Sequence, residues 1–152
     1  MHISWSFLDK RRATISAIQA YPSMDFIMKN TDAEIKNTRM KMEGVGAQNM
    51  DGLPHAHNPQ TSEDRLIGCI NEIDTIKERY RQAAEYMNWF IPAWNQLSEE
   101  EQYILATFYM DEEECRSGVS LIEDRFRIEK TSAYNRKNRA LDHLTTLLYG
   151  KA

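Results

Sequence analysis

Glycine, proline and cysteine are scarce in this chain of 152 residues, which contains six, four and two of them. Because glycine and proline interrupt regular structure, their scarcity favours long regular elements. No apolar run approaches the roughly 18 residues that a membrane-spanning helix needs, so we expect no membrane partner. Cys69 and Cys115 lie far apart and are expected to be single thiols rather than a disulfide.

Sequence motifs that carry enzymatic chemistry are also missing. The chain has no glycine-rich phosphate loop, no cysteine and histidine spacing typical of zinc sites, and no HExxH pattern. The histidines have no evident nucleophilic partner, and His55 and His57 are interpreted as polar loop residues rather than metal ligands. The sequence therefore predicts a protein that is not an enzyme and that holds neither a metal nor another cofactor.

The first residues, MHISWSFLDKRR, place their charges after their apolar residues. A secretory signal has the opposite order, with basic residues first. We therefore expect a cytoplasmic protein.

Charge is distributed unevenly along the chain, although the total at pH 7 is only −4. Between Arg125 and His143, six basic residues stand against two acidic ones, a net charge of +4 that leaves −8 for the remainder. A basic segment on an acidic body is compatible with binding to nucleic acid through that segment. An ordinary solvated helix face would show the same charges, so charge alone does not separate these interpretations.

The first 96 residues are predicted to form a helical hairpin. Helical character extends from about Ser4 to Met42, and Pro22 predicts either two helices or one sharply kinked helix there. Residues 44–60 hold three of the six glycines and two of the four prolines and are interpreted as a loop.

A long helix follows this loop, starts near Thr61 or Ser62, and should kink or end at Pro92. Its apolar residues recur at alternating steps of four and three, with Lys77 as the one break. They are Leu66, Ile70, Ile73, Tyr80, Ala84, Met87, Ile91 and Trp94. This heptad pattern predicts lengthwise packing against another helix. That partner is either the N-terminal helix of the same chain or a second copy, which would make a homodimer through the long helices.

Residues 97–150 are predicted to form a separate domain of short helices. Ser98 and Glu101 make a capping box at the start of the first one. After an acidic turn come a short helix, a tight turn and a last helix that ends at Gly150. Two helices joined by a tight turn, the second of them basic, outline a helix-turn-helix. The predicted fold class is all-α: a long N-terminal helical hairpin followed by a C-terminal helix-turn-helix.

The last helix has two contrasting faces at 3.6 residues per turn. Apolar residues on one face, which we expect in the core, are Ala133, Ala140, Leu144 and Leu147, with Leu141 and Leu148 beside them. The opposite face carries Thr131, Asn135 and Asn138, flanked by Lys130 and Tyr134. Asparagine can bind adenine through two hydrogen bonds, and threonine can contact a thymine methyl group.

Basic residues surround this polar face and are predicted to contact phosphates, which position a protein on DNA without reading its sequence. They are Arg127, Arg136, Lys137 and Arg139. The same periodicity also suits an amphipathic helix that caps a bundle and leaves its polar face solvated.

Two segments carry a family resemblance: LSEEEQYILATFYM and IEDRFRIEKTSAYNRKNRAL. With them, the stretch from Leu97 to Leu148 resembles region 4 of sigma-70 factors, and more closely the late transcriptional regulators of phages and prophages of the ArpU type. The resemblance covers about a third of the chain. It implies a sequence-specific transcriptional regulator that binds double-stranded DNA. By position, the residues approaching the bases are Lys130, Thr131, Tyr134 and Asn135.

Three residues depart from the family pattern. Arg127 stands where the turn usually has glycine, so a left-handed backbone there would cost about 1 kcal/mol. Glu129 replaces the usual serine cap; its charge suits the helix dipole but repels phosphate. Glu123 replaces a small alanine between the two helices, which predicts looser packing or a motif that no longer binds DNA.

Two other functions fit the same residues. Region 4 of sigma factors also contacts RNA polymerase, so the acidic body with Tyr103, Phe108 and Tyr109 could serve a protein partner without DNA. A small terminase, the packaging adaptor of phages, likewise joins a helix-turn-helix to an oligomerising helix.

Overall fold

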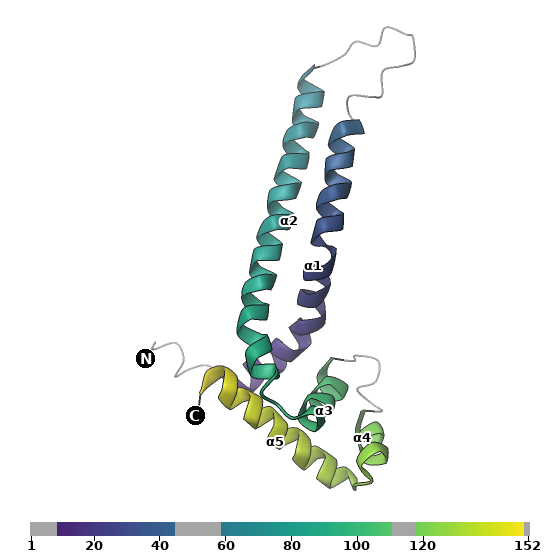
Figure 1. The fold of residues 1–152 in the computed structure, drawn as a ribbon, viewed down its shortest axis with the longest axis vertical. Coiled ribbons are helices and arrows are strands. Elements are labelled where there is room, and N and C mark those ends of the chain that lie inside the picture. The colour runs from purple at the N-terminus through teal and green to yellow at the C-terminus, as the bar shows by residue number, and fades with distance from the viewer. Residues whose placement is uncertain (1–8, 45–58, 111–117, 151–152) are drawn as a thin grey trace. The chain divides into compact units, whose positions relative to one another are not determined.

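The computed structural model describes residues 9–44, 59–110 and 118–150, and every regular element within them is a helix (Figure 1). In chain order these are α1 (Lys10–Gly44), α2 (Pro59–Trp94), α3 (Glu99–Tyr109), α4 (Gly118–Phe126) and α5 (Lys130–Tyr149). The predicted all-α fold is confirmed for this part of the chain. None of these helices combines the length and apolar character that crossing a membrane requires.

Contacts divide the described residues into two compact units. Unit 1 combines the residues up to Met24 with those from Tyr86 onward, and unit 2 runs from Asp25 to Glu85. The sequence placed its domain boundary after residue 96. The contacts instead group the start of α1 and the end of α2 with α3, α4 and α5.

The main core of unit 1 draws on four helices. Its buried members are Ala17, Ile18, Phe90, Leu97, Leu105, Ala140, Leu141, Leu144 and Leu148. The α5 members recur at steps of three and four residues, which places them on one face of that helix. This is the predicted core face, except that Leu147 is 38% exposed.

Phe90 of α2 is the centre of an aromatic cluster in this core. It is fully buried, and its ring centroid lies 5.3 Å from Tyr86, 5.5 Å from Trp94 and 5.8 Å from Tyr21. Aromatic pairs at these separations attract each other beyond the effect of burial alone. Because Tyr21 belongs to α1, this cluster packs α1 against α2 within unit 1.

α1 continues through Pro22 as one helix, so the predicted alternative of two separate helices is wrong. Proline has no N–H to donate to the carbonyl four residues earlier, that of Ile18. Next to this gap, the hydroxyl of Tyr86 donates a hydrogen bond of 2.5 Å to the carbonyl of Ala17. Burial raises the pKa of Tyr86, which keeps the hydroxyl protonated as a donor. The predicted helix start near Ser4 lies outside the described residues.

α3 begins with the predicted capping box, which is confirmed. The Ser98 hydroxyl accepts from the Glu101 N–H at 3.3 Å, and the Glu101 carboxylate accepts from the Ser98 N–H at 2.9 Å. Gln102 stands where an apolar residue would complete a hydrophobic staple. Its side-chain amide instead donates to the carbonyl of Trp94 at 2.9 Å, a polar link to the end of α2.

The capping carboxylate also contacts α5, because Oε1 of Glu101 lies 3.0 Å from Nδ1 of His143. Burial by itself raises the pKa of Glu101, but the hydrogen bonds from Ser98 and His143 outweigh burial and lower it. Glu101 is therefore ionised at neutral pH and links the start of α3 to α5.

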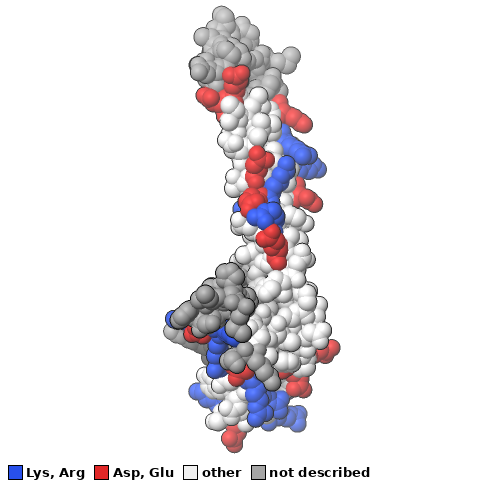
Figure 2. Space-filling model, turned by 90° about the vertical axis from the view of Figure 1, so that its left-hand side faces the viewer, with Lys and Arg blue, Asp and Glu red and all other residues white. Residues whose placement is uncertain are grey.

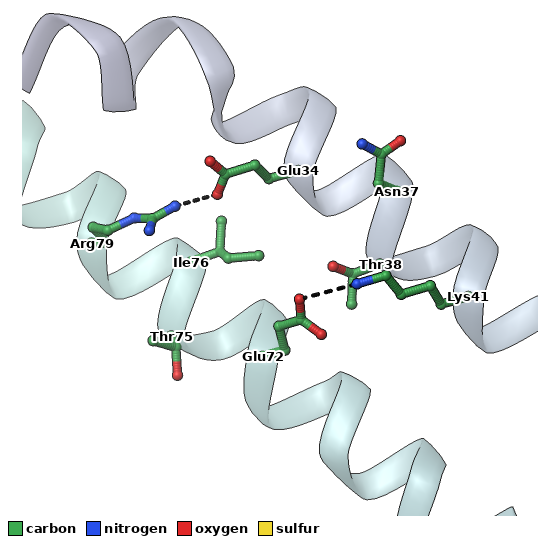
Figure 3. A pocket seen from close by; sticks show the side chains of 8 residues that line it. All are labelled: Glu34, Asn37, Thr38, Lys41, Glu72, Thr75, Ile76 and Arg79. Carbon is green, nitrogen blue, oxygen red and sulfur yellow. Dashed lines mark hydrogen bonds and ion pairs between the residues drawn. The ribbon is translucent and has the colours of Figure 1, made fainter. Parts of the chain in front are cut away.

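Unit 2 is an antiparallel pair formed by α1 and α2 (Figure 1). Two ion pairs connect the helices, one between Arg79 and Glu34 and one between Lys41 and Glu72 at 3.5 Å. The later residue of α1 pairs with the earlier residue of α2, as an antiparallel arrangement requires. Figure 3 shows both pairs beside Ile76. Their side chains line a groove of about 460 Å³. Exposed pairs add little stability but favour one register.

The apolar seam of α2 differs from the predicted one. The buried residues of this helix are Ile73, Ile76, Ala83 and Phe90. The predicted seam contained Ala84 and Ile91, whereas the buried residues are Ala83 and Phe90. The predicted seam was also interrupted by Lys77, whereas the neighbouring Ile76 is buried. Leu66 and Ile70, predicted for the seam, are 38% and 49% exposed. The prediction was wrong by one residue at three positions: it shares Ile73 with the observed seam but continues through Lys77 instead of Ile76.

Candidate nucleic-acid interface

α4 and α5 are separated by residues 127–129. The N–H of Ile128 donates to the carbonyl of Glu123 at 3.2 Å, with Arg127 between them at a φ of 51°. This bond across a left-handed residue is the one that closes a Schellman motif, in which glycine is usual. The cost of about 1 kcal/mol expected for arginine in a left-handed conformation therefore applies here.

A second apolar core holds α5 against α3 and α4. Its buried residues are Ile104, Phe108, Ile122 and Ala133. Ala133 has no exposed surface, so the first turns of α5 lie directly on this core. Ile128 packs against the same cluster immediately after the turn. Glu123 is only partly buried, and the adjacent Ile122 supplies the contact within the core.

The face of α5 opposite Ala133 is open to solvent in its first two turns. The exposed residues there include Lys130, Thr131, Tyr134 and Asn135, the four that the family resemblance assigns to the bases. The ring of Tyr134 lies 6.0 Å from that of Phe108 on α3, which limits where its hydroxyl can point. We call the surface formed by these four exposed side chains the reading face, after the role that the family resemblance implies for them.

Glu129 is the N-cap residue of α5, but its side chain makes no capping hydrogen bond. Its backbone is extended, with φ −74° and ψ 156°, as N-cap residues usually are. The first N–H groups of α5 therefore have no side-chain cap, an arrangement that attracts anions. The carboxylate of Glu129 opposes that attraction where a phosphate would approach.

Asn138 was predicted to belong to the same polar face but lies in different surroundings. It is only partly exposed, and its Oδ1 accepts a hydrogen bond of 2.8 Å from Nη2 of Arg11 on α1. Arg11 also lies 3.9 Å from Asp142, one turn further along α5. Sequence reasoning missed Arg11, because no local pattern connects residues so far apart in the chain.

Two of the predicted phosphate contacts are engaged within unit 1. Arg136 lies 3.6 Å from Glu100 and 5.3 Å from the ring centre of Phe126. The ammonium of Lys137 lies 5.2 Å from the ring centre of Phe108 and 5.2 Å from that of Tyr134. Cation–ring contacts of this kind help to hold α5 on its neighbours.

Arg139 and Arg127 keep exposed side chains. Arg139 lines an open groove of about 430 Å³ between the start of α3 and α5, together with Arg136 and Glu100. Arg125, in the last turn of α4, stacks 4.0 Å above the ring of Tyr103 and so extends the basic surface along α4. Figure 2 shows that Lys and Arg side chains alternate with Asp and Glu side chains over the described surface.

No family model, curated protein or solved structure matches this chain. The resemblance to sigma-70 region 4 and to ArpU-type regulators therefore stays a prediction from the residues quoted for it.

Residues that could ligate a metal do not gather in the described part of the chain. No group of three or more histidine, cysteine, aspartate or glutamate side chains there is arranged to hold an ion. Cys69 is a free, partly buried thiol. His55, His57 and Cys115 lie outside the described residues.

Proposed function

We propose that this protein is a sequence-specific transcriptional regulator that binds double-stranded DNA, of the kind found in phages and prophages. The proposed module is α4, the turn and α5, acting as a helix-turn-helix like that of sigma-70 region 4. The reading face would enter the major groove, which admits one α-helix.

One observation carries this proposal. Ala133 anchors the first turns of α5 to the core, and the opposite side presents Lys130, Thr131, Tyr134 and Asn135 to solvent. Hydroxyl, amide and ammonium groups are the side chains that contact base edges. The exposed guanidinium groups of Arg127 and Arg139 are suited to the neighbouring phosphates.

The experiment that tests the proposal is selection of bound sequences from a pool of random duplex DNA, using the full chain. We expect a recurring motif and an affinity that falls steeply with salt concentration. Absence of salt-dependent binding to any duplex would overturn the proposal.

Exposed apolar side chains in unit 2 support a second part of the proposal, that two copies pair through the long helices. The large apolar residues of this unit that are 38% to 61% exposed are Phe26, Met40, Leu66, Ile67, Ile70 and Tyr80. Apolar surface of this kind is often covered by a partner. Sizing of the DNA complex by light scattering should give two chains per duplex, whereas a ring-sized oligomer would favour the packaging adaptor.

Function as a partner of RNA polymerase without DNA is less well supported. Phe108, one of its three proposed contact residues, is 7% exposed, and Tyr103 lies beneath Arg125. Both side chains are engaged inside unit 1. Co-purification of polymerase subunits that persists after nuclease treatment would favour this alternative.

A further inference from the structure

The guanidinium of Arg11, from α1, binds the polar face of α5 at Asn138. Nη2 of Arg11 donates to Oδ1 of Asn138 at 2.8 Å, and Nη1 lies 3.9 Å from Oδ1 of Asp142. Asn138 and Asp142 continue the face that begins at Thr131 and Asn135, since successive members are three or four residues apart. A residue from the first turn of α1 thus completes a surface formed otherwise by α5.

This contact removes Asn138 from base recognition. An asparagine that recognises adenine uses both its carbonyl oxygen and its amide N–H₂. Here the carbonyl oxygen already accepts from Arg11, and the residue is only partly exposed. Bidentate recognition by Asn138 would require this bond to break.

The position of Arg11 along α5 is that of a phosphate contact. The axial rise from Lys130 to Asn138 is about 12 Å at roughly 1.5 Å per residue. In helix-turn-helix proteins the N-terminal residues of the recognition helix contact the base edges, so a side chain two turns further along lies away from those bases and nearer the sugar–phosphate backbone. A cation at Asn138 therefore meets a phosphate rather than a base.

Arg11 keeps the means to bind that phosphate. A guanidinium has five N–H donors, of which the bond to Asn138 uses one. Its side chain is 49% exposed. It also offsets the charge of Asp142, which would otherwise face the DNA backbone.

We propose that Arg11 of α1 is a phosphate-binding residue of the DNA interface and that its bond to Asn138 ends the base-reading face at Asn135. This inference rests on the proposed function, and it adds a contact from a helix outside the helix-turn-helix. Arg11 would bind a backbone phosphate of the duplex, next to the bases that α5 contacts.

The test compares full-length variants on one random-sequence duplex over a range of salt concentrations. Arg11→Ala should weaken binding and reduce the slope of log K against log salt by about one. Asp142→Asn in the Arg11→Ala background should recover part of the affinity, because it removes the uncovered acid, but should leave the slope reduced. Arg39→Ala is the matched control: an exposed arginine of the same helix in unit 2, expected to leave the slope unchanged.

Asn138→Ala supplies the second readout, by selection from random duplexes. Its selected motif should equal that of the wild type, whereas Asn135→Ala should lose preference at one position. A wild-type slope for Arg11→Ala, or a lost base preference for Asn138→Ala, would overturn the inference and leave the proposed function intact. Failure of the wild type to bind any duplex would overturn both. Unchanged urea midpoints for these variants exclude unfolding as the cause.

Discussion

Arg127 combines two properties in one residue: a strained backbone and an exposed positive charge. Its φ of 51° closes the end of α4, and its side chain points away from the core. The backbone property belongs to folding, and the charge belongs to the proposed interface. Glycine relieves the strain and also removes the charge, so stability and DNA binding must be measured separately to distinguish the two effects.

Arg127→Gly should therefore raise the free energy of unfolding by about 1 kcal/mol and lower the salt slope of DNA binding by about one. Urea denaturation and binding titrations measure the two effects. Arg125→Gly, in the last turn of α4, is the control for glycine inside a helix, where it should destabilise by about 1 kcal/mol. Destabilisation by Arg127→Gly would show that the left-handed conformation is not the one the chain adopts in solution.

Asn135 is the residue of the reading face whose side chain can form two hydrogen bonds to one base, adenine. Asn135→Ala should cost roughly 1–3 kcal/mol on the preferred duplex and relax specificity at one base position. Arg139→Ala should instead weaken binding to all duplexes alike and reduce the salt slope by about one. A uniform loss for Asn135→Ala would contradict its assignment to a base.

At the scale of the element, α3 depends on its capping box and on the link to α5. The pKa of Glu101 is lowered in the folded chain because hydrogen bonds from Ser98 and His143 outweigh the effect of burial. A carboxyl group with a lowered folded pKa adds stability above its unfolded pKa of about 4.3. That contribution is lost as the pH falls through the lower folded value.

Glu101→Gln should therefore be less stable than the wild type at pH 7, and the two should converge as the pH is lowered below about 4. Urea midpoints measured from pH 3 to pH 7 test this expectation. Glu99→Gln changes a charge in the same first turn without touching the capping box, and it controls for the helix dipole. A difference between wild type and Glu101→Gln that stayed constant with pH would rule out the ionised link.

At the scale of the whole molecule, unit 1 depends on Phe90, which the predicted seam of α2 omitted in favour of Ile91. Phe90→Ala should destabilise the chain by about 3–5 kcal/mol, since it removes the centre of a cluster drawn from both long helices. Leu147→Ala is the control in the same unit, because Leu147 is 38% exposed, and its effect should be clearly smaller, about 1 kcal/mol. Thermal or urea unfolding compares them, and similar effects would refute the assigned core.

The seam of α2 could have been predicted correctly from the sequence of this helix. The predicted register places Lys77 on the seam, whereas the observed one places Ile76 there and continues through Ala83 to Phe90. The buried residues are three and seven positions apart, a heptad spacing without a charged member. The pattern of α2 therefore favours the observed register over the predicted one.

Local signals were nonetheless sufficient for much of the result. The helical character of the chain, the capping box at Ser98 and the end of α5 at Gly150 follow from interactions within a few residues, and the structure confirms them. The polarity of the reading face also follows from helical spacing alone. The contacts of Phe90 with Tyr21, of Lys137 with Phe108 and of Asn138 with Arg11 depend instead on tertiary packing, because each joins two helices. Arg11 and Asn138 are 127 residues apart, and only the folded chain brings a guanidinium to that amide.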